Sequence, residues 1–458
     1  MRKDTFAKTF RFWKPDSHDI DPNQRLKVLV WIYFLLWVFE GALRKWFIPA
    51  LSTPLLLVRD PIVVWLIILA SRRGLLKANI YYSGMIILGI LSILTAVFLG
   101  HGNLLVALYG ARNMLLYFPL IFIIGRVFNE EDVIKMGKMI LYISIPMTIL
   151  LVLQFYSPQS SWVNRGVGGD EAGAGFGGAL GYFRPPGTFS FTNGVAYFYS
   201  LVTPFLIYFL LTPKKINKKI LIAANAALLI AIPISISRGL FFQVAVSVIF
   251  LLLAISRKPK YSGKVFIGLI LVAVCMAVFS NIDFFNTATD AFTSRFDDAN
   301  KTEGGLVKGV LGNRFLGALI AAITTSADSV LGYGVGSGTA VGANLLNYYN
   351  IVLVADFEWI REIAELGIMG LFLIAFRVGL ALKISMASYY KLKKDGLLPW
   401  LIMSVALLVL TQGTWNQPTS LGFCSLISGL WLASLKTTAV RKITEKQEKK
   451  LNEKELAY

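Results

Sequence analysis

Residues 235–282 read SISRGLFFQVAVSVIFLLLAISRKPKYSGKVFIGLILVAVCMAVFSNI, and this stretch decides the fold. Two apolar runs, 239–256 and 265–282, enclose a short loop that carries four Lys and Arg residues. A helix of about 18 apolar residues is long enough to cross roughly 30 Å of hydrocarbon. The pattern therefore predicts two membrane-spanning helices joined by a basic loop.

The same pattern recurs along the whole chain. Of its 458 residues, 56% are hydrophobic and only 16% are charged, whereas soluble domains carry about 25% charged residues. This composition excludes a soluble enzyme, a secreted disulfide scaffold and a disordered tail protein. We predict an all-α integral membrane protein with twelve transmembrane helices, at about 28–43, 54–70, 80–99, 104–125, 133–156, 187–211, 220–236, 239–256, 265–282, 360–382, 398–412 and 420–435.

The net charge of +19 indicates membrane topology. Twelve spans place both termini on one side, and if that side is cytoplasmic, 32 of the 45 Lys and Arg residues fall in cytoplasmic segments. Reversing the orientation would violate the positive-inside rule at every loop. We therefore expect contact with membrane lipids and no nucleic-acid partner.

The polar segments outline the expected organisation. We expect a basic cytoplasmic tail, a polytopic membrane domain and a second basic tail, over residues 1–27, 28–435 and 436–458. Two long loops, about 157–186 and 283–355, should lie on the outer side. The glycines of the first loop predict either a mobile lid over a site or a flexible connector. Residues 306–325 of the second loop predict an apolar-faced helix.

The Lys and Arg residues outside the cytoplasmic segments are the informative ones. Arginine near a bilayer centre costs about 2.5–3.5 kcal/mol, so each one in or beside a span needs a partner. Counting along the predicted spans places Arg377 near the cytoplasmic end of the span at 360–382. The same counting places the other arginines at one level, at the outer side of the membrane. Guanidinium groups bind phosphate bidentately, so such a cluster suits a diphosphate at a membrane surface. The residues are Arg44, Lys45, Arg59, Arg112, Arg165, Arg184, Arg238, Arg295, Lys301, Lys308, Arg314, Arg361 and Arg377.

Several segments, in order, resemble the O-antigen polymerase and O-antigen ligase superfamily. RPPGTFSFTNGVAYFYSLVTPFL (184–206) is similar to the family's Arg-x-x-Gly-Thr-Phe entrance to a span, and SISRGLFFQVAVSVIF (235–250) to its Ser-Arg-Gly turn. GNRFLGALIAAI followed by VLGYGVGSG resembles the large-loop Arg and the glycine-alternating stretch after it. EIAELGIMGLFLI (362–374) resembles the Glu-x-Gly start of the next span.

The resemblance implies a fold of the glycosyltransferase-C type in the bacterial cytoplasmic (inner) membrane. It also implies a polyprenyl-diphosphate-linked oligosaccharide substrate on the periplasmic side, and no cofactor or metal. Arg238 and Arg314 would hold the lipid diphosphate, with Arg184 assisting. Arg59 and Arg112, which reach the same level, are further candidates. A chain-length regulator or a flippase would be a further protein partner.

One departure from the family bears on the reaction. Its ligases carry His-Asn about nine residues before the Glu of Glu-x-Gly, where this chain has Asp356-Phe357. The histidines are His18, in the N-terminal tail, and His101, in a short outer turn. This difference favours a polymerase over a ligase. A polysaccharide or lipid transporter is the alternative from another class.

Carboxylates are then the candidates for accepting the acceptor's proton. Asp356 is one, and Glu358, Arg361, Glu362 and Glu365 share one helical face. One interpretation is a catalytic set of Asp356, Glu358, Arg361 and Glu365, with a carboxylate as general base or as a clamp for sugar hydroxyls. The other is a salt-bridged first helical turn.

Two further motifs have a plainer interpretation. LGYGVGSG lacks the Lys-Ser/Thr of a nucleotide loop, so it predicts a tight turn near the glycan. We expect Trp415 either to stack on a sugar or to belong to the belt of tryptophans at the membrane interface.

Overall fold

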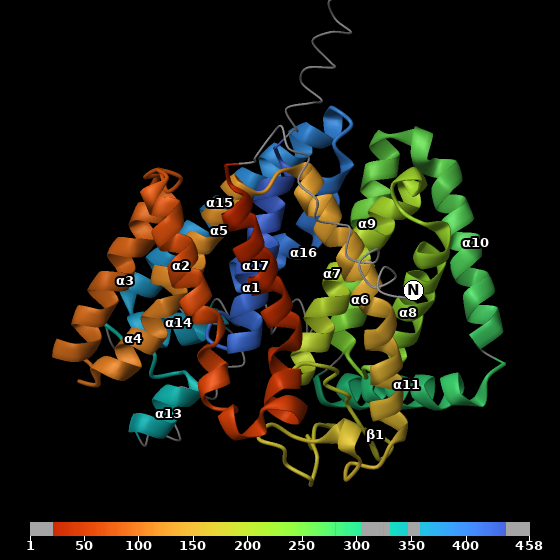
Figure 1. The fold of residues 1–458 in the computed structure, drawn as a ribbon, viewed down its shortest axis with the longest axis horizontal. Coiled ribbons are helices and arrows are strands. Elements are labelled where there is room, and N and C mark those ends of the chain that lie inside the picture. Colours follow the sequence, from red (N-terminus) through yellow and green to blue (C-terminus); the bar gives the residue numbers. More distant parts are fainter. Residues whose placement is uncertain are drawn as a thin grey trace, which may run out of the picture.

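The computed structural model describes residues 22–279, 281–303, 320, 324, 330–346 and 358–436. The predicted ligand Arg314, the predicted catalytic Asp356 and most of the helix expected at 306–325 lie outside these residues. The described chain is almost entirely helical, and its one sheet is a short hairpin (Figure 1).

The helices follow the apolar runs of the sequence. Their bounds are α1 Gln24–Ala42, α2 Arg59–Arg72, α3 Ile80–Phe98, α4 Leu104–Arg112, α5 Phe118–Val127, α6 Glu130–Tyr156, α7 Thr192–Leu211, α8 Lys218–Ile234, α9 Arg238–Arg257, α10 Ser262–Phe279, α11 Asp283–Glu303, α13 Ala340–Leu346, α14 Glu358–Leu366, α15 Ile368–Lys393, α16 Leu397–Gln412 and α17 Pro418–Ser434. The hairpin pairs β1 (Gly177–Ala179) with β2 (Tyr182–Phe183) in antiparallel fashion.

Nine helical segments in the described chain are long and apolar enough to cross a membrane. They are 24–47, 54–72, 80–98, 104–127, 130–156, 192–211, 238–257, 259–279 and 368–393. The helices at the three other predicted spans, α8, α16 and α17, have 17, 16 and 17 residues. The prediction of an all-α membrane protein is thus confirmed at the level of helical content and apolar helices.

Two predicted boundaries differ from the structure. The helix expected from residue 187 begins at Thr192, because Pro185, Pro186 and a Gly187 with φ of +60° form a turn before it. The helix expected at 360–382 is two helices, α14 and α15. They meet at Gly367, whose φ of +57° ends α14.

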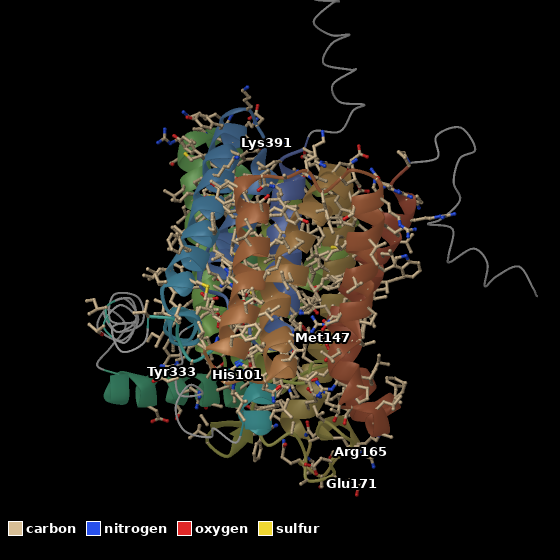
Figure 2. All side chains as sticks on the ribbon, turned by 90° about the vertical axis from the view of Figure 1, so that its left-hand side faces the viewer. His101, Met147, Arg165, Glu171, Tyr333 and Lys391 are labelled. Carbon is tan, nitrogen blue, oxygen red and sulfur yellow. The ribbon has the colours of Figure 1, made fainter. Side chains whose placement is uncertain are left out.

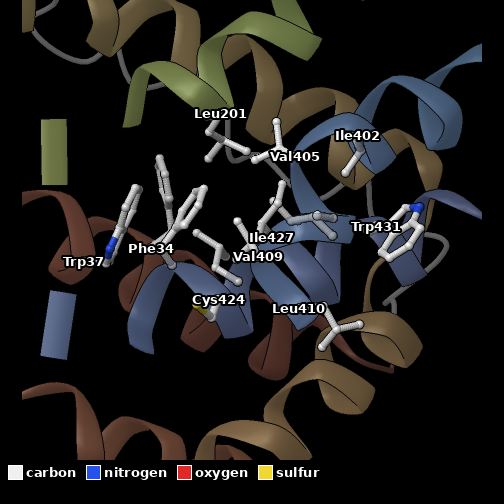
Figure 3. Packing of buried hydrophobic residues seen from close by; sticks show 14 of the residues in the cluster. Phe34, Trp37, Leu201, Ile402, Val405, Val409, Leu410, Cys424, Ile427 and Trp431 are labelled. Carbon is white, nitrogen blue, oxygen red and sulfur yellow. The ribbon is translucent and has the colours of Figure 1, made fainter. Parts of the chain in front are cut away.

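The core lies around α17, which runs through the middle of the bundle (Figure 1). Trp37 of α1, Leu201 of α7 and Val405 of α16 pack with Cys424 and Ile427 of α17 in one buried apolar cluster (Figure 3). By contrast, none of the apolar stretch of α10 is buried within the protein. Its exposed apolar side chains are those expected of a lipid-facing helix.

The basic loops meet at one end of the bundle, which we term the basic end. Lys258, after α9, pairs with Asp395, between α15 and α16, at 2.8 Å. Lys391, at the end of α15, pairs with Glu130, at the start of α6, at 3.4 Å, and Figure 2 shows Lys391 at this end. Sequence segments with excess Lys and Arg are therefore neighbours in space.

The opposite end carries the long connections, and we term it the loop end. The hairpin, α11 and α13 lie there, with α11 across the ends of neighbouring helices (Figure 1). Arg165, Glu171, His101 and Tyr333 are also at this end (Figure 2). Helix α9 begins at this end with Arg238 and runs to the basic end, where Lys258 follows it.

Candidate functional site

Three arginines come together at the loop end, where α9 begins. Arg184 follows β2, Arg238 is the first residue of α9, and Arg295 lies on α11. Two of them, Arg184 and Arg238, were predicted as ligands from the sequence. We call Arg184, Arg238 and Arg295 the arginine cluster.

Local structure explains how each arginine is placed. The hairpin turn uses left-handed backbone at Leu180 and Gly181, and the Arg184 N–H then donates to the Phe176 carbonyl oxygen at 2.8 Å. Ser237 caps α9, its Oγ accepting from the Leu240 N–H at 3.3 Å, so that Arg238 begins the helix. The Arg295 Nη1 donates to the Gly178 carbonyl oxygen of the hairpin at 3.2 Å.

The electrostatics of the arginine cluster favour an anion. Burial, together with the neighbouring guanidinium groups of Arg295 and Arg238, lowers the pKa of Arg184 from its ordinary value. The Nε of Arg184 is buried and has no hydrogen-bond partner in the part of the chain that the structure describes. Arg238 also begins a helix, where the backbone N–H groups favour negative charge. An anionic group placed here would relieve the repulsion and satisfy the unused donor.

Aromatic rings fix α11 against α9 beside these arginines. The rings of Phe241 and Phe296 lie 5.7 Å apart, and those of Phe241 and Phe292 lie 5.9 Å apart, both edge to face. This packing holds Arg295 in position, because Arg295 precedes Phe296 on α11. The sequence placed Arg295 at the outer level, but it gave no reason to select Arg295 as a ligand.

Arg59 and Arg112 are engaged elsewhere. Arg59 Nε lies 3.1 Å from the Glu40 carboxylate, and its Nη2 donates to the Pro418 carbonyl oxygen at 2.6 Å. Arg112 Nη1 donates to the Asp60 carboxylate at 2.9 Å. Both arginines are buried. The structure therefore supplies protein partners for the two, where the sequence analysis expected a diphosphate.

Two of the carboxylates predicted to be catalytic, Glu358 and Glu365, belong to a buried ion network. Arg361 lies between Glu358 and Glu365, with 2.7 Å from its Nη1 to a Glu365 oxygen. Glu362 pairs with Arg377 of α15, and its second carboxylate oxygen is buried without a partner among the described residues. This arrangement matches the alternative of a salt-bridged helical turn, extended to a second helix.

The position of Arg377 differs from the one expected from the sequence. It was placed near the cytoplasmic end of a span at 360–382, but α15 runs to Lys393, so Arg377 lies well inside the helix and is 1% exposed. The Glu362 carboxylate and the Trp415 ring, 4.5 Å from the guanidinium carbon, hold it there. The error arose because the predicted span ended at residue 382, whereas the helix continues to Lys393.

The glycine-alternating stretch wraps around Glu365. The N–H groups of Gly336 and Gly338 donate to the Glu365 carboxylate at 3.1 and 2.8 Å. Gly336 has φ of +90°, and a Cβ there would lie 2.2 Å from the Val106 carbonyl oxygen of α4. The stretch forms the predicted tight turn, and a carboxylate of the protein itself occupies its backbone donors.

Trp415 is neither a belt tryptophan nor a sugar platform. It is 1% exposed, it covers Arg377, and its backbone N–H donates to Glu358 at 2.9 Å. The ring is therefore inaccessible to lipid and to a glycan. Instead, Trp415 joins the loop between α16 and α17 to the ion network.

No family model matches the chain, and no curated protein sequence matches it. Within the described residues, no three His, Cys, Asp or Glu side chains converge as a metal-binding group. The function therefore rests on the geometry and chemistry of the site.

Proposed function

We propose that the chain is a membrane glycosyltransferase that polymerises polyprenyl-diphosphate-linked oligosaccharide repeat units on the periplasmic face and releases polyprenyl diphosphate. The observation that carries the proposal is the convergence of Arg184, Arg238 and Arg295 at one end of the bundle. The proposal includes twelve membrane crossings and cytoplasmic termini, with the loop end facing the periplasm.

The reaction explains why arginines are needed. A hydroxyl oxygen of one glycan attacks the anomeric carbon of another, and the bond between that carbon and the diphosphate breaks. The electron pair leaves on the diphosphate, so negative charge grows there in the transition state. Fixed guanidinium groups stabilise that charge, and they do so more strongly in a site from which water is excluded. The hydroxyl proton passes to a base or to the departing diphosphate.

The ion network contributes to this proposal through architecture. Glu358 and Glu365 each accept hydrogen bonds from the backbone and also pair with Arg361. The lone pairs of their carboxylate oxygens are therefore occupied by groups of the protein itself. We therefore assign them the task of holding the loops at 330–339 and 413–417 in place. Catalysis by Glu358, Arg361 or Glu365 stays a prediction, as do the roles of Arg314 and Asp356.

The test is polymer formation by purified protein from lipid-linked repeat units. Arg238→Lys keeps the charge but loses the two-point fork of the guanidinium. Losing one such contact to a leaving group costs about 2–4 kcal/mol, or roughly 30- to 1,000-fold in rate. The matched control is Arg257→Lys, at the exposed other end of the same helix, which should keep the wild-type rate. Wild-type rates for Arg184→Lys, Arg238→Lys and Arg295→Lys alike would refute the proposal.

A deletion strain separates the alternatives. A polymerase predicts loss of long chains with single repeat units retained at the surface. Loss of all surface glycan with accumulation of lipid-linked polymer would instead indicate a ligase. Repeat units left on the cytoplasmic face would indicate a transporter.

A further inference from the structure

Uncharged polar side chains gather at the loop end where α7 begins and where α16 passes into α17. The Asn193 Nδ2 donates to the Gln417 Oε1 at 2.9 Å, and Tyr197 and Thr414 share a hydrogen bond of 3.1 Å between their hydroxyl oxygens. Asn416 lies between Trp415 and Gln417 in the same loop. We call Asn193, Tyr197, Thr414, Asn416 and Gln417 the amide patch.

The backbone of this loop is held from behind by the ion network. Glu358 accepts the Trp415 N–H at 2.9 Å, and the Arg377 guanidinium lies against the Trp415 ring. The Trp359 indole N–H donates to the Thr411 carbonyl oxygen at 2.7 Å. Buried charges on α14 and α15 thus position a loop whose own side chains are neutral. Such fixed polar groups are pre-organised for binding.

One hydrogen-bond acceptor of this loop, the Oδ1 of Asn416, has no partner among the described residues. The Asn416 Nδ2 donates to the Gly338 carbonyl oxygen at 3.3 Å, so the amide orientation leaves Oδ1 as the acceptor without a partner. Gln417 is exposed. Amide and hydroxyl groups without net charge suit a ligand that offers many hydroxyls.

A short series of contacts connects the amide patch to the arginine cluster. Arg184 donates its backbone N–H to Phe176, and the rings of Phe176 and Phe191 lie 5.7 Å apart. Phe191 immediately precedes α7, whose second residue is Asn193. The start of α7, which carries Asn193, and the segment that carries Arg184 are therefore connected at the loop end.

We propose that the amide patch is the binding subsite for the sugar of the acceptor glycan, separate from the arginine cluster that binds the donor diphosphate. This assignment rests on the proposed function. It predicts that sugar recognition and diphosphate recognition can be removed independently.

The test uses the oligosaccharide freed from its lipid diphosphate, obtained by mild acid treatment of lipid-linked units from a deletion strain. Binding to the purified full-length protein is measured by calorimetry for the wild type, Asn193→Ala, Gln417→Ala and Arg238→Lys. Each alanine variant should weaken binding about 10-fold, because each removes a neutral hydrogen-bonding group. Arg238→Lys should leave the affinity unchanged. Asn281→Ala removes an exposed amide at the end of α10 and is the matched control.

The outcomes separate this inference from the proposed function. Equal affinity in all variants, or no binding to the wild type, would overturn the amide-patch assignment and leave polymerisation untouched. Oligosaccharide binding that is weakened about 10-fold in each alanine variant, in a protein that makes no polymer, would support the subsite and refute the polymerase. Gln417 is exposed, and Asn193 and Arg238 are only partly buried, so melting temperatures within about 1 °C of the wild type are expected and would exclude unfolding as the cause.

Discussion

Replacing Glu365 with Gln tests whether the ion network is architectural or catalytic. The Glu365 carboxylate is 2% exposed and accepts the N–H groups of Gly336 and Gly338 together with Arg361 Nη1. Glutamine has nearly the same shape, but it offers one acceptor oxygen and a donating NH2 group. In either orientation of the amide, the NH2 group faces at least one N–H donor.

The magnitude follows from these contacts. A buried donor left without a partner costs about 1–3 kcal/mol, and breaking one side of a buried ion pair costs about 3–5 kcal/mol. Arg361 keeps Glu358, so we expect the lower end, about 3 kcal/mol. With an unfolding entropy of about 2.1 cal/mol/K per residue, a chain of this length should melt roughly 3 °C lower.

The assay is thermal melting of the purified protein in detergent beside its polymerisation rate. Asp395→Asn is the control: its ion pairs with Lys258 and Lys260 are half exposed, so the loss should be below about 1 kcal/mol. A Glu365→Gln protein that melts like the wild type but has lost its activity would refute the architectural assignment. It would instead make Glu365 a candidate catalytic residue.

Three further predictions concern the same region. Burial raises the pKa of Glu362 above its ordinary value, despite the neighbouring guanidinium groups of Arg377 and Arg361. The folded protein therefore holds this proton more tightly than the unfolded chain, and the stability that this proton contributes at low pH is lost as the pH rises through the raised pKa. Melting scans from about pH 6 to 9 should show a smaller decline in Glu362→Gln than in the wild type, and an equal decline would contradict the prediction. Arg377→Lys should lower stability by about 1–3 kcal/mol in the same melting assay, because lysine lacks the planar group that covers Trp415; an unchanged melt would show that the stacking contributes nothing. Gly336→Ala should abolish the yield of folded protein, because the new Cβ would collide with the Val106 carbonyl oxygen. The yield is measured by size-exclusion chromatography. Gly102→Ala is the control: Gly102 also has a positive φ but lies in open space, so this substitution should lower stability by only about 1–2 kcal/mol.

The roles of individual arginines were the least predictable part of the site. Arg112 is paired with Asp60, 52 residues earlier, and Arg59 with Glu40 and the distant Pro418 carbonyl. Counting along predicted spans assigned both arginines to one outward-facing level, but such a level does not identify a partner. Only the packing of α1, α2, α4 and α17 decides that these two are paired with Asp60 and Glu40, and only the packing of the hairpin, α9 and α11 brings Arg184, Arg238 and Arg295 together.

The sequence by itself determined the helical membrane architecture and the gathering of basic loops at one end. The length and hydrophobicity of an apolar run depend only on the residues of that run. A run of about 18 apolar residues is therefore sufficient to predict a helix in the bilayer. The tertiary structure alone decided the division at Gly367, the ion network around Arg361 and the composition of the arginine cluster. These features depend on electrostatic and hydrogen-bonding partners that are close in space and far apart in sequence, and such interactions weaken with distance between atoms, whatever the separation along the chain.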